Sequence, residues 1–327
     1  MILSLFFFLF LISSFFSRLN SQLFFIYIFG KLSFQILICG ILLFFILIIS
    51  KKLWTSIICI FICALLTIDI FSSCNHCNAF IEDESQKHNK IRLMTFNTGF
   101  IDNFKNVHEL ILFEKPDIIQ FQEVSPYMQN KLKSLKSFFP YNIGLNEPTE
   151  HFSSIILSRY PLKKDKVINH YAVVAKVFLD KTEFTIIGIH LLAPLNQLLL
   201  DQFAYLYFKY NKVNNLQLPL RGNFDVALEQ MKYLKTLIDH NNQNLILMGD
   251  LNMTSASKRF RNFLQETNLY TYTSYKHPTF TWPAFFPKFF GIQIDHVLFS
   301  ENLKITRKKT TNHFGSDHRA LIVDLAF

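Results

Sequence analysis

Several features are scarce or missing in this 327-residue chain, and each absence narrows its possible chemistry. No cysteine follows residue 77, so the stability of the long C-terminal part does not depend on disulfides, and a cysteine-rich zinc site is excluded there. No Ser, Cys or Thr lies in a recognisable nucleophile elbow, so no covalent nucleophile is indicated. No internal repeat or low-complexity tract follows the hydrophobic start.

Charged residues are nearly absent from the first 73 residues. Uncharged apolar runs occupy residues 1–17, 32–50 and 53–68, and the last continues to residue 73 with only Asp69 interrupting. Each run is close to the length of a transmembrane helix. The first lacks the basic start and small-residue cleavage site of a signal peptide. The pattern predicts a membrane anchor over residues 1–73 with about three transmembrane helices.

The few basic residues of this segment predict its orientation. Lys51 and Lys52 form the densest positive cluster, which favours the cytoplasmic side, and Arg18 and Lys31 oppose this only weakly. The predicted location is therefore a bacterial inner membrane, crossed several times, with the C-terminal domain in the periplasm or outside the cell. The chain has 33 basic and 24 acidic residues, of which the anchor holds four basic and one acidic, so 29 basic and 23 acidic residues remain in the rest of the chain. This mildly basic balance suits anionic substrates or membrane surfaces.

All five cysteines lie between residues 39 and 77. Three of them sit in apolar runs and are expected to act as small hydrophobic residues. Cys74 and Cys77 have C-x-x-C spacing with a histidine between them. A metal or redox pair, plain cysteines next to the membrane, and a local disulfide all remain open.

Residues 74–90 are polar and predict a linker, and residues 91–327 predict one large domain. Its most informative stretch is 244–252, in which a buried strand ends abruptly in Gly249-Asp250-Leu251-Asn252. Side chains alternate along an extended chain, so Asp250 and Asn252 are expected to face one ligand together. Further strands are expected at 91–97, 118–124, 154–158, 172–179, 183–190, 293–300 and 320–325, and helices at 107–113, 195–210, 224–240 and 257–267.

Two segments have an unusual composition. Residues 191–220 are rich in Leu, Tyr and Phe, and they predict either a helix packed on the domain or a lid lying against a bilayer. The aromatic and proline-rich loop at 281–287 is a second candidate for contact with lipid.

Polar side chains recur at the ends of the predicted strands. A core could bury this many charges only with basic partners, which are not evident. Carboxylate and amide oxygens suit a hard divalent cation such as magnesium, and histidines beside carboxylates suit acid–base catalysis and phosphate recognition. The residues concerned are Asn97, Glu123, His190, Asp250, Asn252, Asp295, Asp317 and His318.

With these residues the chain resembles the endonuclease/exonuclease/phosphatase superfamily. The matching motifs follow the family's order: Thr95-Phe96-Asn97, Gln120-Phe121-Gln122-Glu123, Ile189-His190, Gly249-Asp250-Leu251-Asn252, Ile294-Asp295-His296-Val297-Leu298 and Gly315-Ser316-Asp317-His318. The Thr281-Trp282-Pro283 element and the apolar N-terminus look most like a membrane-anchored bacterial branch.

The resemblance implies an α/β four-layer sandwich of two packed mixed sheets flanked by helices, preceded by the transmembrane helices. It implies a Mg²⁺ or Mn²⁺ ion held by Glu123, with Asn97 and Asp317 close to it. Asp250 would orient or deprotonate the attacking water, and Asn252 would hold a phosphate oxygen. The resemblance also assigns His318 to the scissile phosphate with Asp295 as its orienting partner, and His190 to a second phosphate contact or to the leaving group.

The expected activity is a metal-dependent phosphoesterase that cleaves phosphodiesters or phosphomonoesters. Nucleic acid and phospholipid remain alternative substrates, and an inactive receptor or scaffold of the same fold is the alternative function. No protein partner is predicted. Arg159 is expected to be structural, Arg221 is either a phosphate contact or a surface residue, and His296 and His313 are not expected to be catalytic.

Overall fold

The computed structural model describes residues 33–71, 75–77, 89–99, 101–147, 154–168, 171–179, 181–193, 223–238, 244–273, 279–285, 287 and 291–327. The chain divides into two compact units. The first contains residues 1–78 together with 253–265, and the second contains residues 79–252 and 266–327.

The first unit contains a helical hairpin made of α3 (Ser33–Ile49) and α4 (Leu53–Phe71). The turn between them is closed by backbone hydrogen bonds from Ser50, Lys51 and Lys52, and Lys51 adopts a left-handed backbone with φ of 55°. Across the hairpin, the Cys59 Sγ lies 3.3 Å from the carbonyl oxygen of Gly40. The two strongly apolar runs therefore form helices that pack on each other.

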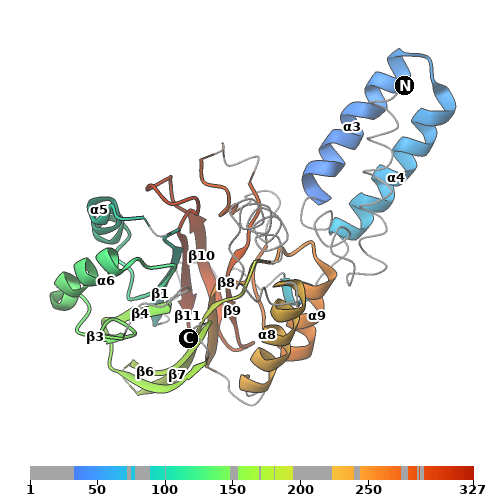
Figure 1. The fold of residues 1–327 in the computed structure, drawn as a ribbon. Helices are drawn as coiled ribbons and strands as arrows, with labels where there is room; N and C mark the ends of the chain where they lie inside the picture. Colours follow the sequence, from blue (N-terminus) through green and yellow to red (C-terminus); the bar gives the residue numbers. More distant parts are fainter. Residues whose placement is uncertain are drawn as a thin grey trace, which may run out of the picture. The chain divides into compact units, whose positions relative to one another are not determined.

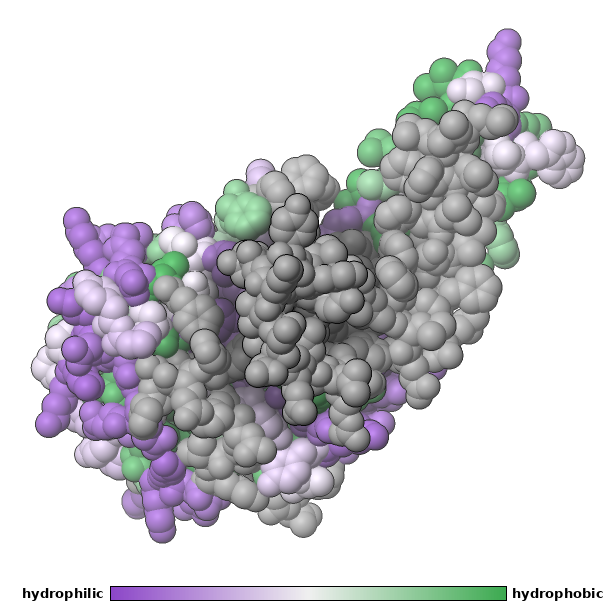
Figure 2. All heavy atoms as spheres, in the orientation of Figure 1, coloured by the Kyte–Doolittle hydropathy of each residue, from purple (hydrophilic) through white to green (hydrophobic). Residues whose placement is uncertain are grey.

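Much of the outer surface of this hairpin is apolar. Ile49, Trp54 and Phe61 are all more than half exposed, and Figure 2 shows hydrophobic residues at the surface of the hairpin. Among the described residues, none of the helices combines the length and apolar character needed to cross a membrane. The expected transmembrane helices thus find no support there, and the first apolar run, 1–17, lies outside the described residues.

The cysteines divide as the composition suggested. Cys59 and Cys63 are buried free thiols in α4, and Cys39 is a free thiol in α3. Cys77 ends a short 3₁₀ helix, η1 (Asn75–Cys77), and is disulfide-bonded, whereas Cys74 lies outside the described residues. A disulfide, one of the three alternatives for the C-x-x-C pair, is therefore present at Cys77.

The second unit is built on two mixed sheets (Figure 1). In the first, β1 and β2 are parallel and every other pair is antiparallel. Its strand order is β10-β11-β1-β2-β4-β3. The strands are β1 (Lys90–Asn97), β2 (Ile118–Gln122), β3 (Tyr141–Ile143), β4 (Ser154–Ser158), β10 (Lys304–Thr310) and β11 (Leu321–Ala326).

The second sheet has the order β5-β6-β7-β8-β9. Here β7 and β8 are parallel, and the other neighbours are antiparallel. Its strands are β5 (Leu162–Ile168), β6 (Ala172–Leu179), β7 (Thr182–His190), β8 (Leu245–Asp250) and β9 (Asp295–Phe299). Each sheet therefore contains one parallel pair of strands, and the two strands of each pair end side by side.

The sheets pack face to face through alternating apolar residues. Leu93 and Ile118 of the first sheet share a buried cluster with Ile186 and Met248 of the second. A second cluster joins the outer face of the first sheet to α5 (Phe104–Glu114), α6 (Pro126–Leu132) and η2 (Lys133–Ser137). Figure 1 shows α8 (Asn223–Leu237) beside β8 and β9, on the side away from α5 and α6. The predicted arrangement of two mixed sheets flanked by helices is confirmed.

The strands that the sequence did not predict, β3, β5 and β10, all lie at sheet edges. β5 and β10 carry three lysines each, as in Leu-Lys-Lys-Asp-Lys-Val-Ile. Edge strands tolerate these lysines, whose charge guards against pairing with another chain. The lysines also hide the alternation of apolar and polar residues by which a strand is recognised in a sequence. The expected helix at 195–210 lies outside the described residues. Helix α9 (Lys258–Thr267) matches its expected range closely.

Candidate active site

Two of the predicted site residues leave the first sheet at the ends of neighbouring parallel strands. β1 ends at Asn97, which pairs with Gln122 at the end of β2, and Glu123 follows directly. Glu123 has a left-handed backbone with φ of 51°. The Thr98 hydroxyl donates a hydrogen bond of 2.6 Å to the Glu123 carbonyl oxygen and so supports this turn. A non-glycine residue in this region is uncommon, and such residues concentrate at functional sites.

Three more site residues are brought together by the pairing of the second sheet. The parallel pair β7/β8 sets His190 opposite Asp250, and the antiparallel pair β8/β9 sets Asp250 opposite Asp295. Gly249 is required just before Asp250, because its φ is 144° and an added Cβ would lie 1.9 Å from the Ile189 carbonyl oxygen. The close approach of β7 and β8 at this point depends on the absence of a side chain.

Asn252 lies two residues beyond β8 and supports Asp250. Its backbone has a φ of 51°, its N–H donates to Asp250 Oδ1 at 2.8 Å, and its side-chain amide donates to the Leu191 carbonyl oxygen at 2.8 Å. Asp250 and Asn252 are thus neighbours, but a turn at the end of β8 brings them together rather than alternation along an extended strand, because Asn252 has a left-handed backbone.

The loop before β11 brings the last two residues to the site. The Ser316 hydroxyl donates to the Asn97 carbonyl oxygen at 2.8 Å and accepts the His318 N–H at 3.0 Å, so it ties this loop to the end of β1. His318 is buried, whereas Asp317 is exposed and accepts a hydrogen bond of 3.0 Å from the indole nitrogen of Trp282.

Side chains from the two sheets meet at the Asn97 amide. Its Nδ2 donates to Glu123 Oε1 at 3.0 Å and to Asp250 Oδ2 at 3.1 Å. His190 Nε2 lies 3.4 Å from the same Glu123 oxygen and 3.8 Å from the same Asp250 oxygen. Four of the predicted residues therefore form one contiguous group.

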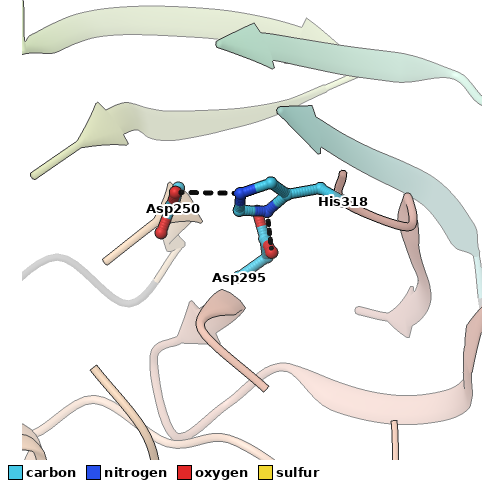
Figure 3. A group of neighbouring side chains, drawn as sticks. All are labelled: Asp250, Asp295 and His318. Carbon is cyan, nitrogen blue, oxygen red and sulfur yellow. Dashed lines mark hydrogen bonds and ion pairs between the residues drawn. The ribbon is translucent and has the colours of Figure 1, made fainter. Parts of the chain in front are cut away.

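A buried dyad of His318 and Asp295 joins this group (Figure 3). His318 Nδ1 lies 2.9 Å from Asp295 Oδ2, and His318 Nε2 lies 3.8 Å from Asp250 Oδ2. The imidazole therefore sits between the two carboxylates. Within the described part of the chain, Asp295 Oδ1 is buried and has no hydrogen-bond partner. All eight predicted residues thus lie at the same edge of the sandwich.

Burial and mutual charge shift the pKa values strongly. Burial raises the pKa of Asp250 to about 7, with the Asp295 carboxylate adding to the effect. Burial alone would lower the pKa of His318, but the Asp295 carboxylate outweighs it and raises the value to about 10. Burial lowers the pKa of His190 to about 3 and, despite the opposing Asn97 hydrogen bond, raises that of Glu123. At neutral pH, His318 is a cation and His190 is neutral.

A buried polar layer beneath these residues was not predicted. The Gln120 side chain crosses from the first sheet to donate to the Ile189 carbonyl oxygen of the second at 3.3 Å, and it also donates to Ser154 Oγ at 3.0 Å. Its Oε1 accepts from the Thr95 hydroxyl at 3.0 Å and from the Gln122 amide. The sequence feature that could have revealed this layer is the pair Gln120 and Gln122 in an otherwise apolar strand, because a spacing of two residues puts both side chains on the inner face.

The remaining polar residues considered in the sequence lie elsewhere. Arg159 follows β4 and lies 3.8 Å from the Asp117 carboxylate, near the opposite end of β2 from Glu123, which fits a structural role. His296 is fully buried, and His313 lies in the exposed part of the loop before β11. Arg221 is outside the residues whose side chains are described.

The donor set of the site fits a hard divalent cation. Glu123, Asp317 and the Asn97 amide offer oxygen atoms, which magnesium and manganese prefer. The raised pKa of Glu123 reflects burial and repulsion from the carboxylates of Asp317 and Asp295. His318 is the cation that offsets this charge for both Glu123 and Asp250. A further positive charge at the open side would relieve the remaining repulsion.

The geometry combines three chemical capacities. Asp250 is a carboxylate with a pKa close to neutrality, suited to accepting a proton. His318 is a cation held by Asp295 and suited to contacting an anionic group. The oxygen donors suit a metal ion, and a metal ion with aimed hydrogen-bond donors stabilises negative charge that develops on phosphate oxygens.

Comparison with known proteins places these residues within one family. Residues 94–318 match the model of the endonuclease/exonuclease/phosphatase family. No curated protein matches the chain at a significant level.

Solved structures show the same fold. An endonuclease/exonuclease/phosphatase from Beutenbergia cavernae has a TM-score of 0.50 and 15% identity, covering 73% of this chain and 72% of its own. Humanized D. rerio TDP2 has a TM-score of 0.50 and 13% identity, covering 73% of this chain and 99% of its own. A sphingomyelinase C from Streptomyces griseocarneus is also similar, with a TM-score of 0.47, 14% identity, and coverage of 72% and 99%.

Proposed function

The chain belongs to the endonuclease/exonuclease/phosphatase family, and we propose that it is a divalent-metal-dependent phosphoesterase that cleaves phosphodiester bonds with an activated water. The observation that carries this proposal is the meeting of Asp250, the Asp295–His318 dyad and the Glu123–Asn97 pair at one edge of the sandwich. A base, a phosphate-binding cation and a set of oxygen ligands are what hydrolysis of a phosphoester requires.

Glu123, Asn97 and Asp317 are the residues that would hold the metal ion. Bound there, Mg²⁺ or Mn²⁺ would neutralise negative charge on the phosphate. Glu123 is only partly buried and Asp317 is exposed, so both carboxylates are reachable from solvent at the open side of the site. Asn97 already contacts Glu123 at 3.0 Å, which holds its amide close to the proposed ligand set.

Each buried residue has a role that its surroundings favour. Asp250 accepts the proton of the attacking water, and the Asn252 backbone N–H holds the Asp250 carboxylate. The Asn252 side-chain amide already donates to the Leu191 carbonyl oxygen, so a contact with a phosphate oxygen would use its second N–H. His318, kept protonated by Asp295, donates a hydrogen bond to the scissile phosphate. Because burial lowers the pKa of His190 to about 3, that residue serves better as a neutral hydrogen-bond donor than as the acid for the leaving group.

We also propose that the N-terminal hairpin attaches the protein to a membrane. The apolar side chains of α3 and α4 that face solvent would be covered by lipid or by protein. The coloured residues of the sandwich unit in Figure 2 are mostly hydrophilic by comparison. If Lys51 and Lys52 mark the cytoplasmic side, the catalytic unit lies on the extracytoplasmic side of a bacterial inner membrane.

Membrane attachment and a modest positive charge favour a phospholipid or another small phosphodiester over nucleic acid. The test is hydrolysis by the full-length protein in detergent of plasmid DNA, mixed phospholipid vesicles and a generic aryl phosphodiester. Each is assayed with Mg²⁺, with Mn²⁺ and with EDTA. Metal-dependent cleavage of one substrate class identifies it. Failure to cleave any of the three, by protein that shows no metal binding in calorimetry, would favour the inactive receptor or scaffold.

A further inference from the structure

A loop that the mechanism does not use lies directly against the site. The carbonyl oxygen of Thr281 accepts the Arg319 N–H at 2.7 Å, and the Ala284 N–H donates to the Asp317 carbonyl oxygen at 2.6 Å. The buried Arg319 guanidinium donates to the carbonyl oxygens of Ala284, at 2.8 Å, and of Pro283, at 3.4 Å. Residues 281–284 are therefore fastened to the loop that carries Asp317 and His318.

The same loop also contacts the second sheet. The Thr281 hydroxyl accepts the N–H groups of Ile294 at 3.1 Å and Asp295 at 3.3 Å, at the start of β9. Asp295 belongs to β9 and His318 precedes β11, so the two members of the dyad come from different sheets. Residues 281–284 hold both of these segments.

One side chain of this loop acts on a proposed metal ligand. The Trp282 indole N–H donates a hydrogen bond of 3.0 Å to Asp317 Oδ2. The other carboxylate oxygen, Oδ1, lies against Gly99, where an added Cβ would approach it to 2.6 Å. The N–H of Gly99 in turn donates to Asn97 Oδ1 at 3.0 Å. Asp317 is thus confined between Trp282 on one side and the backbone beside Asn97 on the other.

We propose that Trp282 is a positioning residue that fixes the Asp317 carboxylate in the orientation needed for metal binding. Asp317 is exposed, and an exposed aspartate free to rotate would have to be ordered whenever the metal binds. The indole donates to Oδ2 and leaves Oδ1 facing Gly99 and the Ser316 hydroxyl, which lies 3.5 Å from it. This inference rests on the proposed metal-dependent function and extends it to a residue that does not itself touch the metal.

Partners that orient metal ligands commonly contribute about 10- to 100-fold to metal affinity or activity. Trp282→Phe keeps the aromatic ring and removes only the N–H donor, so we expect it to weaken Mn²⁺ binding about tenfold. Phe285→Ala is the matched control, because Phe285 belongs to the same loop and is 64% exposed. It is expected to bind Mn²⁺ like the wild type.

The experiment measures the dissociation constant of Mn²⁺ for the full-length protein in detergent by calorimetry. The variants are W282F, F285A, Asp317→Asn, and W282F combined with Asp317→Asn. If Trp282 acts through Asp317, W282F weakens binding in the wild-type background and has no further effect when Asp317 is already replaced. Equal Mn²⁺ affinity in W282F and the wild type, or losses that simply add in the double variant, would overturn the proposal.

A second readout does not depend on replacing Trp282. The chain has two tryptophans, and Trp54→Phe leaves Trp282 as the only one. We expect Mn²⁺, a paramagnetic quencher, to reduce the Trp282 fluorescence of this variant in a saturable way, and Asp317→Asn to shift the titration to higher Mn²⁺. Quenching that needs the same Mn²⁺ concentration with and without Asp317 would contradict the proposal. If the wild type binds no Mn²⁺ at all, the proposed function fails as well, which separates the two outcomes.

Discussion

At the scale of single residues, the site depends on groups whose pKa values are moved in opposite directions by one buried environment. Burial of Asp250 and partial burial of Glu123 raise the pKa values of both carboxyl groups, whereas His318 retains its proton because two carboxylates flank it. His190 lies within 4 Å of two carboxylates and still loses its proton, because burial dominates. The neighbours of each residue, rather than its type, therefore decide its role.

His318 should make stability depend on pH. Its pKa of about 10 in the folded protein exceeds the ordinary histidine pKa of 6.5, so its stabilising contribution is fully present below pH 6.5 and is lost as pH rises through 10. Burial lowers the pKa of Lys308 to about 7, so the contribution of Lys308 to stability rises as pH increases above 7, opposite to that of His318. The wild type must therefore be compared with His318→Gln. We expect His318→Gln to destabilise the protein more at pH 7 than at pH 10.

The measurement is urea unfolding of the Trp54→Phe protein and of its His318→Gln variant in EDTA, followed by Trp282 fluorescence, which reports on the sandwich unit. Asp295→Asn is the matched control, because it leaves His318 without its closest carboxylate and should reduce the same pH dependence. A destabilisation by His318→Gln that is equal at pH 7 and pH 10 would contradict the assigned charge.

At the scale of strands and loops, the sequence predicted which polar residues lie together better than how they are held. The ends of β1, β2, β7 and β8 were recognisable, because a run of buried residues stopping at a polar one is a local pattern. The contact between Trp282 and Asp317 joins residues 35 positions apart, and that between Gln120 and Ile189 joins residues 69 apart. No local pattern encodes such contacts. The edge strands β5 and β10 escaped prediction because their lysines mask alternation, and β3 is only three residues long.

The inter-sheet contact of Gln120 should matter for both stability and activity. Gln120→Leu keeps a similar volume but removes the hydrogen bonds that the Gln120 side chain makes with Thr95, Gln122 and Ile189. An unsatisfied buried polar group costs about 1–3 kcal/mol, so we expect a loss of roughly 2–3 kcal/mol in the free energy of unfolding. The buried polar layer around Gln120 lies directly beneath Glu123 and Asp250, so turnover should also fall by about tenfold. Losses of this size are typical when a contact that orients a metal ligand is removed.

Thr271→Val is the control for this variant. Thr271 is buried, and its hydroxyl donates to the Val297 carbonyl oxygen at 3.1 Å within the same unit. It should cost about 1 kcal/mol in urea unfolding and leave turnover unchanged. If Gln120→Leu loses no more stability than Thr271→Val and keeps full turnover, the inter-sheet contact of Gln120 supports neither the fold nor the site.

At the scale of the whole molecule, the chain joins the sandwich unit to an apolar helical hairpin, and we expect the hairpin to determine where the protein resides. Removing residues 1–73 should move the protein from the membrane fraction to the soluble fraction, since the exposed apolar side chains of α3 and α4 are then absent. Flotation on a density gradient with added vesicles measures this. Ile49→Lys with Phe61→Lys in the full-length chain is a milder version that should weaken flotation without deleting the helices.

The outcome that would count against membrane attachment is equal flotation of the full-length and shortened proteins. Protease digestion of intact cells and of spheroplasts then tests the side of the membrane. Cleavage of the sandwich unit only after the outer barrier is opened would support the extracytoplasmic location, and protection in spheroplasts would contradict it.

The most direct test of the central claim is turnover of a generic aryl phosphodiester by Asp250→Asn, with Mn²⁺ affinity measured on the same sample. Asp250 is the proposed base, and general-base catalysis contributes about 10²–10⁴-fold. We therefore predict that the variant loses at least about 100-fold in kcat while it still binds Mn²⁺. Turnover by Asp250→Asn at the wild-type rate would contradict the assignment of the active site to this edge of the sandwich.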